Sequence, residues 1–310
     1  GNGVTAFVSI TRGCDNMCTF CVVPYTRGRE RSRKPESIIE ECKQLIIDGY
    51  KEVTLLGQNV DSYLWYGGGA KKDFLKSSIQ AQKESINFDK LLSKVAINCP
   101  ELRIRFSTSN PQDMTKEVIE TMAKYNNICN HIHLPVQSGS TRILKVMKRG
   151  YTRKAYITLV DTIKSIIPDC AISMDIITGF CTETEEDHLE TLSLMNYVKY
   201  EFGYMFKYSI RPNTPAARLE DDVPEKTKQR RLSEIISKQN SHALLKNQAK
   251  IGHTYEVLVE GTSKKSKDEI FGRTEYNSVI VFPKGNYKVG DLVMVKVEQC
   301  SSATLKGKSV

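Results

Sequence analysis

Three cysteines near the start of the chain carry the clearest chemical signal. Cys14, Cys18 and Cys21 lie within eight residues and are separated by several polar residues, whereas core cysteines would alternate with apolar ones. A structural zinc site needs four ligands, and no fourth Cys or His follows within twenty residues. A disulfide would leave one thiol over in a reducing compartment. An iron–sulfur cubane held by three thiolates fits the pattern better, and its open iron could coordinate a substrate.

The elements that must position this loop follow from the periodicity of the first 210 residues. Six apolar runs alternate with six amphipathic segments, which implies a parallel sheet with right-handed crossovers. We therefore expect an α/β fold, a partial (β/α)6 TIM-like barrel, with the cysteines at the C-terminal ends of its strands. The predicted strands are 6–10, 52–56, 103–107, 131–136, 171–178 and 204–210, and the predicted helices are 35–48, 88–98, 115–125, 141–148, 152–167 and 185–200.

Two segments depart from this alternation. Residues 65–87 are rich in Gly, Lys, Ser and Gln, and we interpret them as a polar insertion. Residues 224–250 predict one long basic helix. Beyond it, short β-rich runs at 254–260, 270–273, 278–282 and 292–297 predict a small all-β barrel. We expect a larger domain over 1–247 and the small barrel over 248–310.

The charge is positive and unevenly distributed. The chain has 45 Lys and Arg against 36 Asp and Glu, and residues 225–310 hold 16 of the basic and 9 of the acidic side chains. A second basic cluster comprises Arg27, Arg29, Arg31, Arg33 and Lys34. Such a run is more often a solvated face than a phosphate site, so its position must decide. No apolar run reaches the roughly 20 residues of a membrane helix, and the first residues lack a signal-peptide pattern, so we expect a cytoplasmic protein without a membrane segment.

At this point the sequence resembles a known family. The cysteine loop resembles the signature of the radical S-adenosylmethionine (SAM) superfamily, whose fold is a full or partial β/α barrel. Within that superfamily the methylthiotransferases are most similar, and the C-terminal region resembles a TRAM domain, an RNA-binding barrel. The segments that carry the likeness are CTFCVVPYTRGRE (18–30), LLGQNV (55–60), RIRFSTSN (103–110), HLPVQSGS (133–140), DIITGF (175–180) and RPNTPA (211–216).

The resemblance implies a transferase that adds a methylthio group to carbon 2 of N6-isopentenyladenosine in the anticodon loop of tRNA, by means of a SAM-derived 5′-deoxyadenosyl radical. Relatives act instead on threonylcarbamoyl-adenosine in tRNA or on an aspartate of a ribosomal protein. A non-catalytic iron–sulfur RNA-binding protein is the remaining alternative. The expected partners are the anticodon arm of tRNA and an electron donor such as flavodoxin or ferredoxin, and the expected state is a monomer.

The resemblance also assigns roles to individual residues. Cys14, Cys18 and Cys21 would hold a 4Fe–4S cluster whose fourth iron binds SAM, with Phe20 against the adenine. The expected SAM contacts at strand ends are Gln58, Ser109 and Gln137. Asp175, an acid within a predicted buried strand, needs a partner, and a structural role is as plausible as a role toward SAM or substrate. The expected RNA contacts are Arg27, Arg29, Arg31 and Arg33, extended by Lys226, Lys228, Arg230 and Arg231 on the basic helix.

The sequence departs from the family in two places. Relatives begin with a further domain whose three cysteines hold an auxiliary 4Fe–4S cluster, but the six other cysteines of this chain are scattered. We therefore expect a fragment of a longer protein, able to cleave SAM but not to deliver sulfur. The segment GFCTET (179–184) replaces the usual GFPGET, which puts the turn geometry in doubt. Cys181 in this turn is more plausibly a small filler than a metal ligand.

Overall fold

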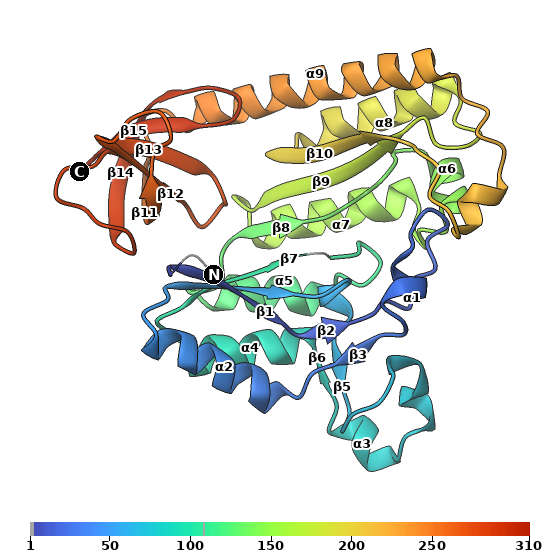
Figure 1. Ribbon diagram of the computed structural model, residues 1–310, viewed down its shortest axis with the longest axis horizontal. Helices are drawn as coiled ribbons and strands as arrows, with labels where there is room; N and C mark the ends of the chain where they lie inside the picture. The colour runs from blue at the N-terminus through green and yellow to red at the C-terminus, as the bar shows by residue number, and fades with distance from the viewer. Residues whose placement is uncertain (1–2, 108) are drawn as a thin grey trace.

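Six parallel strands form a half-barrel, the larger region in Figure 1: β1 (Thr5–Ser9), β4 (Glu52–Leu56), β7 (Arg103–Ser107), β8 (His131–His133), β9 (Ala171–Thr178) and β10 (Phe202–Lys207). The computed structural model describes residues 3–107 and 109–310. The strands form two parallel sheets, β1-β4-β7 and β10-β9-β8, and β7 lies next to β8. The two edge strands, β1 and β10, leave one side open. The predicted partial α/β barrel is therefore confirmed.

Amphipathic helices cover the outer face of this half-barrel, as the alternating pattern predicted (Figure 1): α2 (Pro35–Ile47), α4 (Phe88–Asn98), α5 (Lys116–Lys124), α6 (Thr141–Val146), α7 (Arg153–Ile166) and α8 (Glu185–Val198). In α7, Tyr156, Val160 and Ile163 recur on one face, and all three are buried against the sheet. Several helices are preceded by a Thr whose hydroxyl accepts a hydrogen bond from the backbone N–H three residues later, and Thr184 forms a full capping box with Asp187.

Two strands end earlier than their apolar runs. β8 stops at His133 because Pro135 has no N–H for the ladder, and pairing with β9 resumes only at the isolated bridge from Gln137 to Ile176. β10 stops at Lys207, since its neighbour β9 ends at Thr178 and the chain turns away at Gly179, which has φ 68°. Both early stops occur at the C-terminal edge, where irregular backbone replaces the ladder.

The segment predicted as a polar insertion contains short regular elements. β5 (Leu64–Trp65) pairs with β6 (Ile86–Asn87), and α3 (Ile79–Lys83) lies between them. A second short ribbon, β2 (Thr11–Arg12) with β3 (Arg31–Ser32), encloses the cysteine loop and α1 (Val23–Thr26). This ribbon places the start of the arginine run beside the cysteine loop.

A long helix, α9 (Glu225–Ala249), crosses the molecule and leads into a closed barrel (Figure 1). The barrel consists of β11 (Thr254–Thr262), β12 (Glu269–Arg273), β13 (Val279–Pro283), β14 (Leu292–Cys300) and β15 (Leu305–Ser309). Alternating residues such as Val257 and Val259 fill its core. Four of these strands were predicted. The fifth, β15, has only one large apolar residue, Leu305, and so gave no β pattern.

The small barrel is docked against the N-terminal ends of the half-barrel strands. The guanidinium of Arg105 on β7 donates to the carbonyl oxygens of Thr274 and Glu275 at 2.6 and 3.2 Å, and its Nε lies 3.0 Å from the Glu52 carboxylate. Arg105 and Glu52 belong to the half-barrel and the two carbonyl groups belong to the small barrel, so this contact joins the two regions. The small barrel therefore does not cover the C-terminal edge of the strands, where the cysteines lie. No helix in the described part of the chain is long and apolar enough to cross a membrane.

Candidate active site

The cysteine loop follows β2 and is anchored from several sides. Gly13 N–H donates to Gln58 Oε1 at 2.7 Å, and Thr19 N–H donates to the Met147 carbonyl at 3.0 Å. Gly13 has φ 78°, and a Cβ there would lie 2.3 Å from the Arg29 carbonyl oxygen, so only glycine fits. Gln58 thus has a defined place in the structure: its amide oxygen orients the loop.

The three thiols of the loop differ in exposure. Cys14 and Cys18 are buried and Cys21 is half-buried. Burial raises the pKa of Cys14 to about 12 and also raises the pKa of Cys21. Thiols in such surroundings stay protonated at neutral pH until a metal displaces the proton. Loading this site therefore releases protons.

The spacing of the thiols bears on what they can hold. Among the described residues, the ligand-type side chains with atoms all within 4.8 Å of one another, as a single ion requires, are Glu185, His188 and Glu234. The loop cysteines are not in that group. Their wider spacing suits a cluster several ångströms across better than a single zinc ion. The Glu185 and Glu234 carboxylates are paired with Arg230 at 2.6 Å each, so this group joins α8 to α9 rather than attracting a cation.

A buried arginine that the sequence analysis missed touches the loop. Arg149 is 7% exposed, and its Nη1 donates to the Sγ of Cys18 at 3.3 Å. It lies in the turn between α6 and α7, far from the cysteines in sequence, and no motif singled it out. Its position shows that the α6–α7 turn belongs to the site.

Buried polar atoms without hydrogen-bond partners gather at the same edge. Among the described residues they are Thr11 Oγ1 after β1, Asn59 Oδ1 and Asp61 Oδ2 after β4, Ser109 Oγ after β7, Gln137 Oε1 after β8, and Thr178 Oγ1 at the end of β9. Buried polar groups normally have hydrogen-bond partners, so six unpartnered atoms at one edge indicate a polar ligand. Ser109 and Gln137 were predicted as ligand contacts, whereas Asn59 and Asp61 were not. The residues present therefore fit a polar cofactor that extends over several strand ends.

The expectation of a buried acid at position 175 is wrong. The Asp175 side chain is 28% exposed, and its Oδ1 lies 3.3 Å from Nε2 of His133 on the neighbouring strand. It alternates with buried residues along β9 and stands on the same face as Ser173, whose hydroxyl contacts the imidazoles of His131 and His133 at 2.8 Å. β9 is an interior strand of the half-barrel, but the face that carries Asp175 is directed toward the open side.

Phe20 packs in a small apolar cluster beside the loop. Its ring meets Phe180 edge to face at a centroid distance of 6.2 Å, and Cys181 and Tyr208 belong to the same cluster. Cys181 is fully buried there and fills space. Thr182, at the position where the family resemblance predicts a glycine, nevertheless has φ 69°. The turn therefore keeps its left-handed backbone despite the β-branched side chain.

The four arginines after the loop have different environments. Arg27 and Arg31 are exposed, and Arg29 is half-exposed, with its nearest carboxylate oxygen, on Asp15, 3.6 Å away. Arg33 is anchored instead, since its Nη1 lies 2.7 Å from both the Ser9 carbonyl and Glu41. Three cations therefore remain available at the mouth of the site.

The expectation that the first turns of α9 extend this basic surface is wrong. Lys228 is buried and paired with Asp221 at 2.7 Å, and Arg231 is buried and paired with Glu183 at 2.9 Å. Arg230 is held by the two glutamates already described. Of the four basic residues expected there, Lys226 alone is exposed and has no ion pair among the described residues. The positive charge of this helix mostly fastens it to the half-barrel.

Comparisons with known proteins agree with this geometry. The family model of the radical SAM superfamily matches residues 8–195, and that of the TRAM domain matches residues 248–310. Proteins named tRNA-2-methylthio-N(6)-dimethylallyladenosine synthase are 65% identical in Christiangramia forsetii, 61% in Flavobacterium johnsoniae and 54% in Bacteroides fragilis. Each covers 100% of this chain, which spans 64%, 64% and 65% of their lengths.

Two solved structures share the fold at low identity. The radical SAM methyltransferase TsrM from Kitasatospora setae superimposes with a TM-score of 0.51 at 16% identity, over 69% of this chain and 38% of its own. Coproporphyrinogen III oxidase (HemN) from Escherichia coli gives 0.51 at 12% identity, over 88% and 67%. The half-barrel, the three-cysteine loop at its C-terminal edge and the match over most of the first 195 residues lead to one assignment: this chain belongs to the radical SAM superfamily.

Proposed function

We propose that this chain is the catalytic and RNA-binding part of a tRNA methylthiotransferase, which adds a methylthio group to carbon 2 of N6-isopentenyladenosine in the anticodon loop. The observation that carries the proposal is the cysteine loop at the strand ends of a chain whose relatives, 54–65% identical, bear that activity in their names. Because the chain spans about 64% of those proteins, the activity is proposed for the whole polypeptide.

We assign the cofactor site to the C-terminal edge of the half-barrel. Cys14, Cys18 and Cys21 would hold a 4Fe–4S cluster and leave its fourth iron to the amino and carboxylate groups of SAM. When bound, the reduced cluster supplies the electron that cleaves SAM to methionine and a 5′-deoxyadenosyl radical. The orphaned Ser109 Oγ and Gln137 Oε1 supply hydrogen bonds that orient the nucleoside.

The remaining predicted contacts divide between this site and its support. Gln58 acts on SAM through the loop that it orients at Gly13. Phe20, fixed against Phe180, presents one face of its ring to the adenine. Asp175 lies on the open side, where its carboxylate faces the target nucleoside together with His133. A second 4Fe–4S cluster, held outside this chain, would supply the sulfur in the whole protein.

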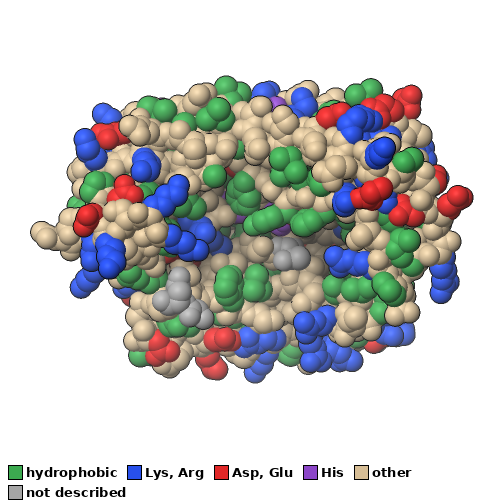
Figure 2. Space-filling view, turned by 45° about the horizontal axis from the view of Figure 1, so that its top comes forward, with side chains coloured by type: hydrophobic (Ala, Val, Ile, Leu, Met, Phe, Trp, Pro, Cys, Tyr) green, Lys and Arg blue, Asp and Glu red, His purple; other side chains and the backbone are tan. Residues whose placement is uncertain are grey.

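The open side of the half-barrel provides a surface for the RNA. Phe7, Tyr204 and Phe206 on the two edge strands are 65%, 56% and 55% exposed, although large apolar rings are normally buried. In Figure 2 hydrophobic side chains lie in a central hollow, and Lys and Arg side chains lie at both ends of it. Exposed rings flanked by cations suit single-stranded nucleotides, whose bases stack while their phosphates pair. A target adenine must leave its stacked loop to react, so such a surface would receive it.

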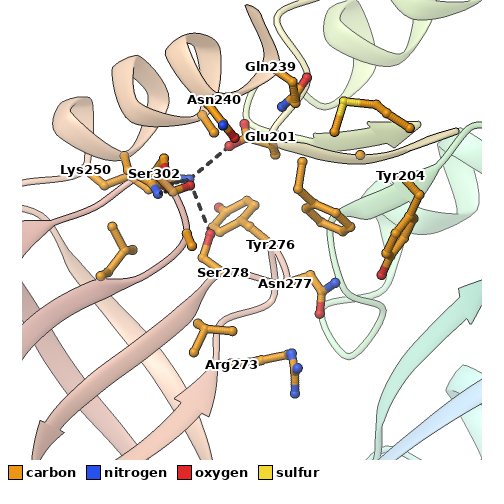
Figure 3. A pocket seen from close by; sticks show the side chains of 18 residues that line it. Glu201, Tyr204, Gln239, Asn240, Lys250, Arg273, Tyr276, Asn277, Ser278 and Ser302 are labelled. Atoms are coloured by element: carbon orange, nitrogen blue, oxygen red, sulfur yellow. Dashed lines mark hydrogen bonds and ion pairs between the residues drawn. The ribbon is translucent and has the colours of Figure 1, made fainter. Parts of the chain in front are cut away.

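A cleft continues this surface toward the small barrel. Its volume is about 350 Å³, and Tyr204, Tyr276, Asn277 and Arg273 line it from both sides of the junction (Figure 3). At its far wall, Lys250 is held by Glu201 at 3.0 Å and by Ser278 at 3.3 Å. The lining is mainly amide and aromatic, which suits nucleotide bases; its two cations, Lys250 and Arg273, are each paired with a glutamate. With Arg27, Arg29 and Arg31 at the opposite end, the footprint would extend along the anticodon arm.

The test uses the full-length polypeptide, reconstituted without oxygen with iron, sulfide, SAM and a chemical reductant. We expect 5′-deoxyadenosine, and 2-methylthio-N6-isopentenyladenosine in tRNA from a strain that lacks the gene. Mass spectrometry of digested tRNA measures the second product. A methylthio product on threonylcarbamoyl-adenosine would show that this nucleoside is the substrate instead. No product on tRNA, together with a methylthiolated aspartate in a ribosomal protein, would show that the protein is the substrate. Tight tRNA binding without SAM cleavage would leave an iron–sulfur RNA-binding protein.

The same preparation tests the remaining expectations. Flavodoxin or ferredoxin should replace the chemical reductant, because the cluster needs a one-electron donor. Light scattering should give the mass of a monomer. Fractionated cells should show the protein in the cytoplasm with its tRNA substrate.

A further inference from the structure

Arg149 is held in an unusual position by its own turn. It stands between Lys148 with φ 54° and Gly150 with φ 75°, and this pair of left-handed residues directs its side chain inward. Three donors of the guanidinium are used: Nη1 on Cys18 Sγ at 3.3 Å, Nη2 on the Pro135 carbonyl at 2.9 Å, and Nε on the Tyr151 hydroxyl at 3.0 Å. The fork geometry therefore fixes the cation against one particular thiol.

Within the part of the chain that the structure describes, the charge of Arg149 has no carboxylate partner. Arg105 and Arg231, the other guanidinium groups exposed by less than 9%, lie 3.0 and 2.9 Å from Glu52 and Glu183. Arg149, in contrast, has no ion pair with any acidic side chain of residues 3–107 and 109–310. A buried cation without a counter-charge is strongly destabilising. The group positioned to supply negative charge is the Cys18 sulfur.

We propose that Arg149 is the counter-charge of the iron–sulfur cluster and that its hydrogen bond to Cys18 raises the reduction potential of that cluster. The proposal rests on the proposed function, because it needs the cluster to be present. A cubane with three thiolates is anionic, and reduction adds one more negative charge. A fixed cation beside a ligand sulfur stabilises the reduced form more than the oxidised form. Arg149 is thus a positioning residue that acts on electron entry through Cys18.

The direction of the effect follows from this charge balance. Removing the cation should make the cluster harder to reduce, so its midpoint potential should shift to more negative values. The bond to the thiol also holds a ligand in place, and outer contacts of this kind change metal affinity by about 10- to 100-fold. We therefore expect weaker retention of iron as a second, independent effect.

The experiment is a reductive titration of the reconstituted full-length protein, followed by electron paramagnetic resonance of the signal that changes when SAM is added. This signal belongs to the cluster with the open iron. For Arg149→Met we expect a negative shift of the midpoint potential and a faster loss of iron to a chelator. Arg149→Lys keeps the charge but not the fork, and its potential should lie between wild type and Arg149→Met.

Arg153→Met is the matched control. Arg153 also fixes a carbonyl oxygen at this end, that of Gly139 at 3.0 Å, but contacts no cysteine. The midpoint potential of the cluster in Arg153→Met should equal that in wild type. An unchanged potential in Arg149→Met with iron retained would overturn the proposal. If Arg149→Met holds no cluster, Arg149→Gln decides, because it keeps a polar side chain but removes the charge. A midpoint potential of Arg149→Gln equal to that of wild type overturns the proposal. A wild-type protein without any SAM-responsive signal would instead refute the proposed function.

Discussion

Each end of the half-barrel contains a buried arginine, and the two have opposite surroundings. At the N-terminal end, Arg105 faces the Glu52 carboxylate and two carbonyl oxygens of the small barrel, and little of it reaches solvent. At the C-terminal edge, Arg149 faces a thiol, a phenol and one carbonyl. Arginine is therefore neutralised by a carboxylate at one end, whereas at the other end it has no carboxylate partner among the described residues.

The difference separates structure from chemistry in this fold. At the N-terminal end the charge of Arg105 is neutralised, and its contacts join the half-barrel to the small barrel. Where a cation, three thiols and several unpaired polar atoms remain, the protein is arranged for groups that it does not itself contain. Substitutions at the two ends should therefore affect different measurements.

The largest effect is expected at the thiols. Cys18→Ala removes one of three thiolates, and we expect loss of the bound iron and of 5′-deoxyadenosine formation below detection. Iron analysis and chromatography of the nucleosides measure both. Cys300→Ala, a thiol of the small barrel, is the control and should retain iron and activity. Full activity in Cys18→Ala would show that the C-terminal edge is not the cofactor site, so the two ends of the half-barrel would not differ in function.

The next effect is on stability at the other end. Arg105→Met leaves the Glu52 carboxylate buried without its partner, and we expect a loss of about 3–5 kcal/mol in the free energy of unfolding. Urea titration followed by circular dichroism measures it. The double variant Arg105→Met with Glu52→Leu should recover part of the loss, because no charge is then left unpaired. A single variant within about 1 kcal/mol of wild type would show that this contact does not hold the junction.

Two buried serines allow a finer comparison. Ser109 Oγ has no hydrogen-bond partner among the described residues, whereas Ser173 Oγ contacts two imidazoles at 2.8 Å. Ser109→Ala should weaken SAM binding by about 10-fold, since it removes one hydrogen bond, and should leave stability unchanged. Ser173→Ala should cost about 1 kcal/mol of stability. Equilibrium binding and urea titration together decide, and a stability loss in Ser109→Ala would mean that its hydroxyl already has a structural partner.

The smallest effect concerns the turn at Thr182. Its φ of 69° strains a β-branched residue, so Thr182→Gly should raise stability by about 0.5–1 kcal/mol. The rise in the thermal midpoint measures it. Lys199, also left-handed with φ 51°, is not β-branched, so Lys199→Gly should give a smaller gain. Equal gains at both positions would show that branching does not strain the turn.

Periodicity was enough to predict the half-barrel and its cysteine loop, because strands buried on both faces and amphipathic helices leave strong patterns. It failed at β15, whose single large apolar residue gives no alternation, and at the ends of β8 and β10, which are set by Pro135 and Gly179. Patterns record which face is buried. They do not record where a neighbouring strand ends.

The site was predictable where its residues are adjacent in sequence and less so where it is assembled by folding. The spacing of the cysteines was enough to identify them as ligands, but Arg149, which contacts Cys18, is 131 residues away in sequence. The charges of α9 show the converse error. Lys228 and Arg231 add to a basic run in the sequence, yet their acidic partners come from other elements, so their availability could be judged only in three dimensions.

Helix α9 has a consequence for how the two regions can evolve. Its first turns are fastened beside Gly179 by Lys228, and its last residues reach the small barrel, so 25 residues form one rod of about 37 Å. Each residue inserted into such a rod lengthens it by about 1.5 Å and rotates everything beyond it by about 100°. The register between the half-barrel and the small barrel is therefore intolerant of insertions and deletions here, although substitutions on the exposed side of the same helix leave it intact.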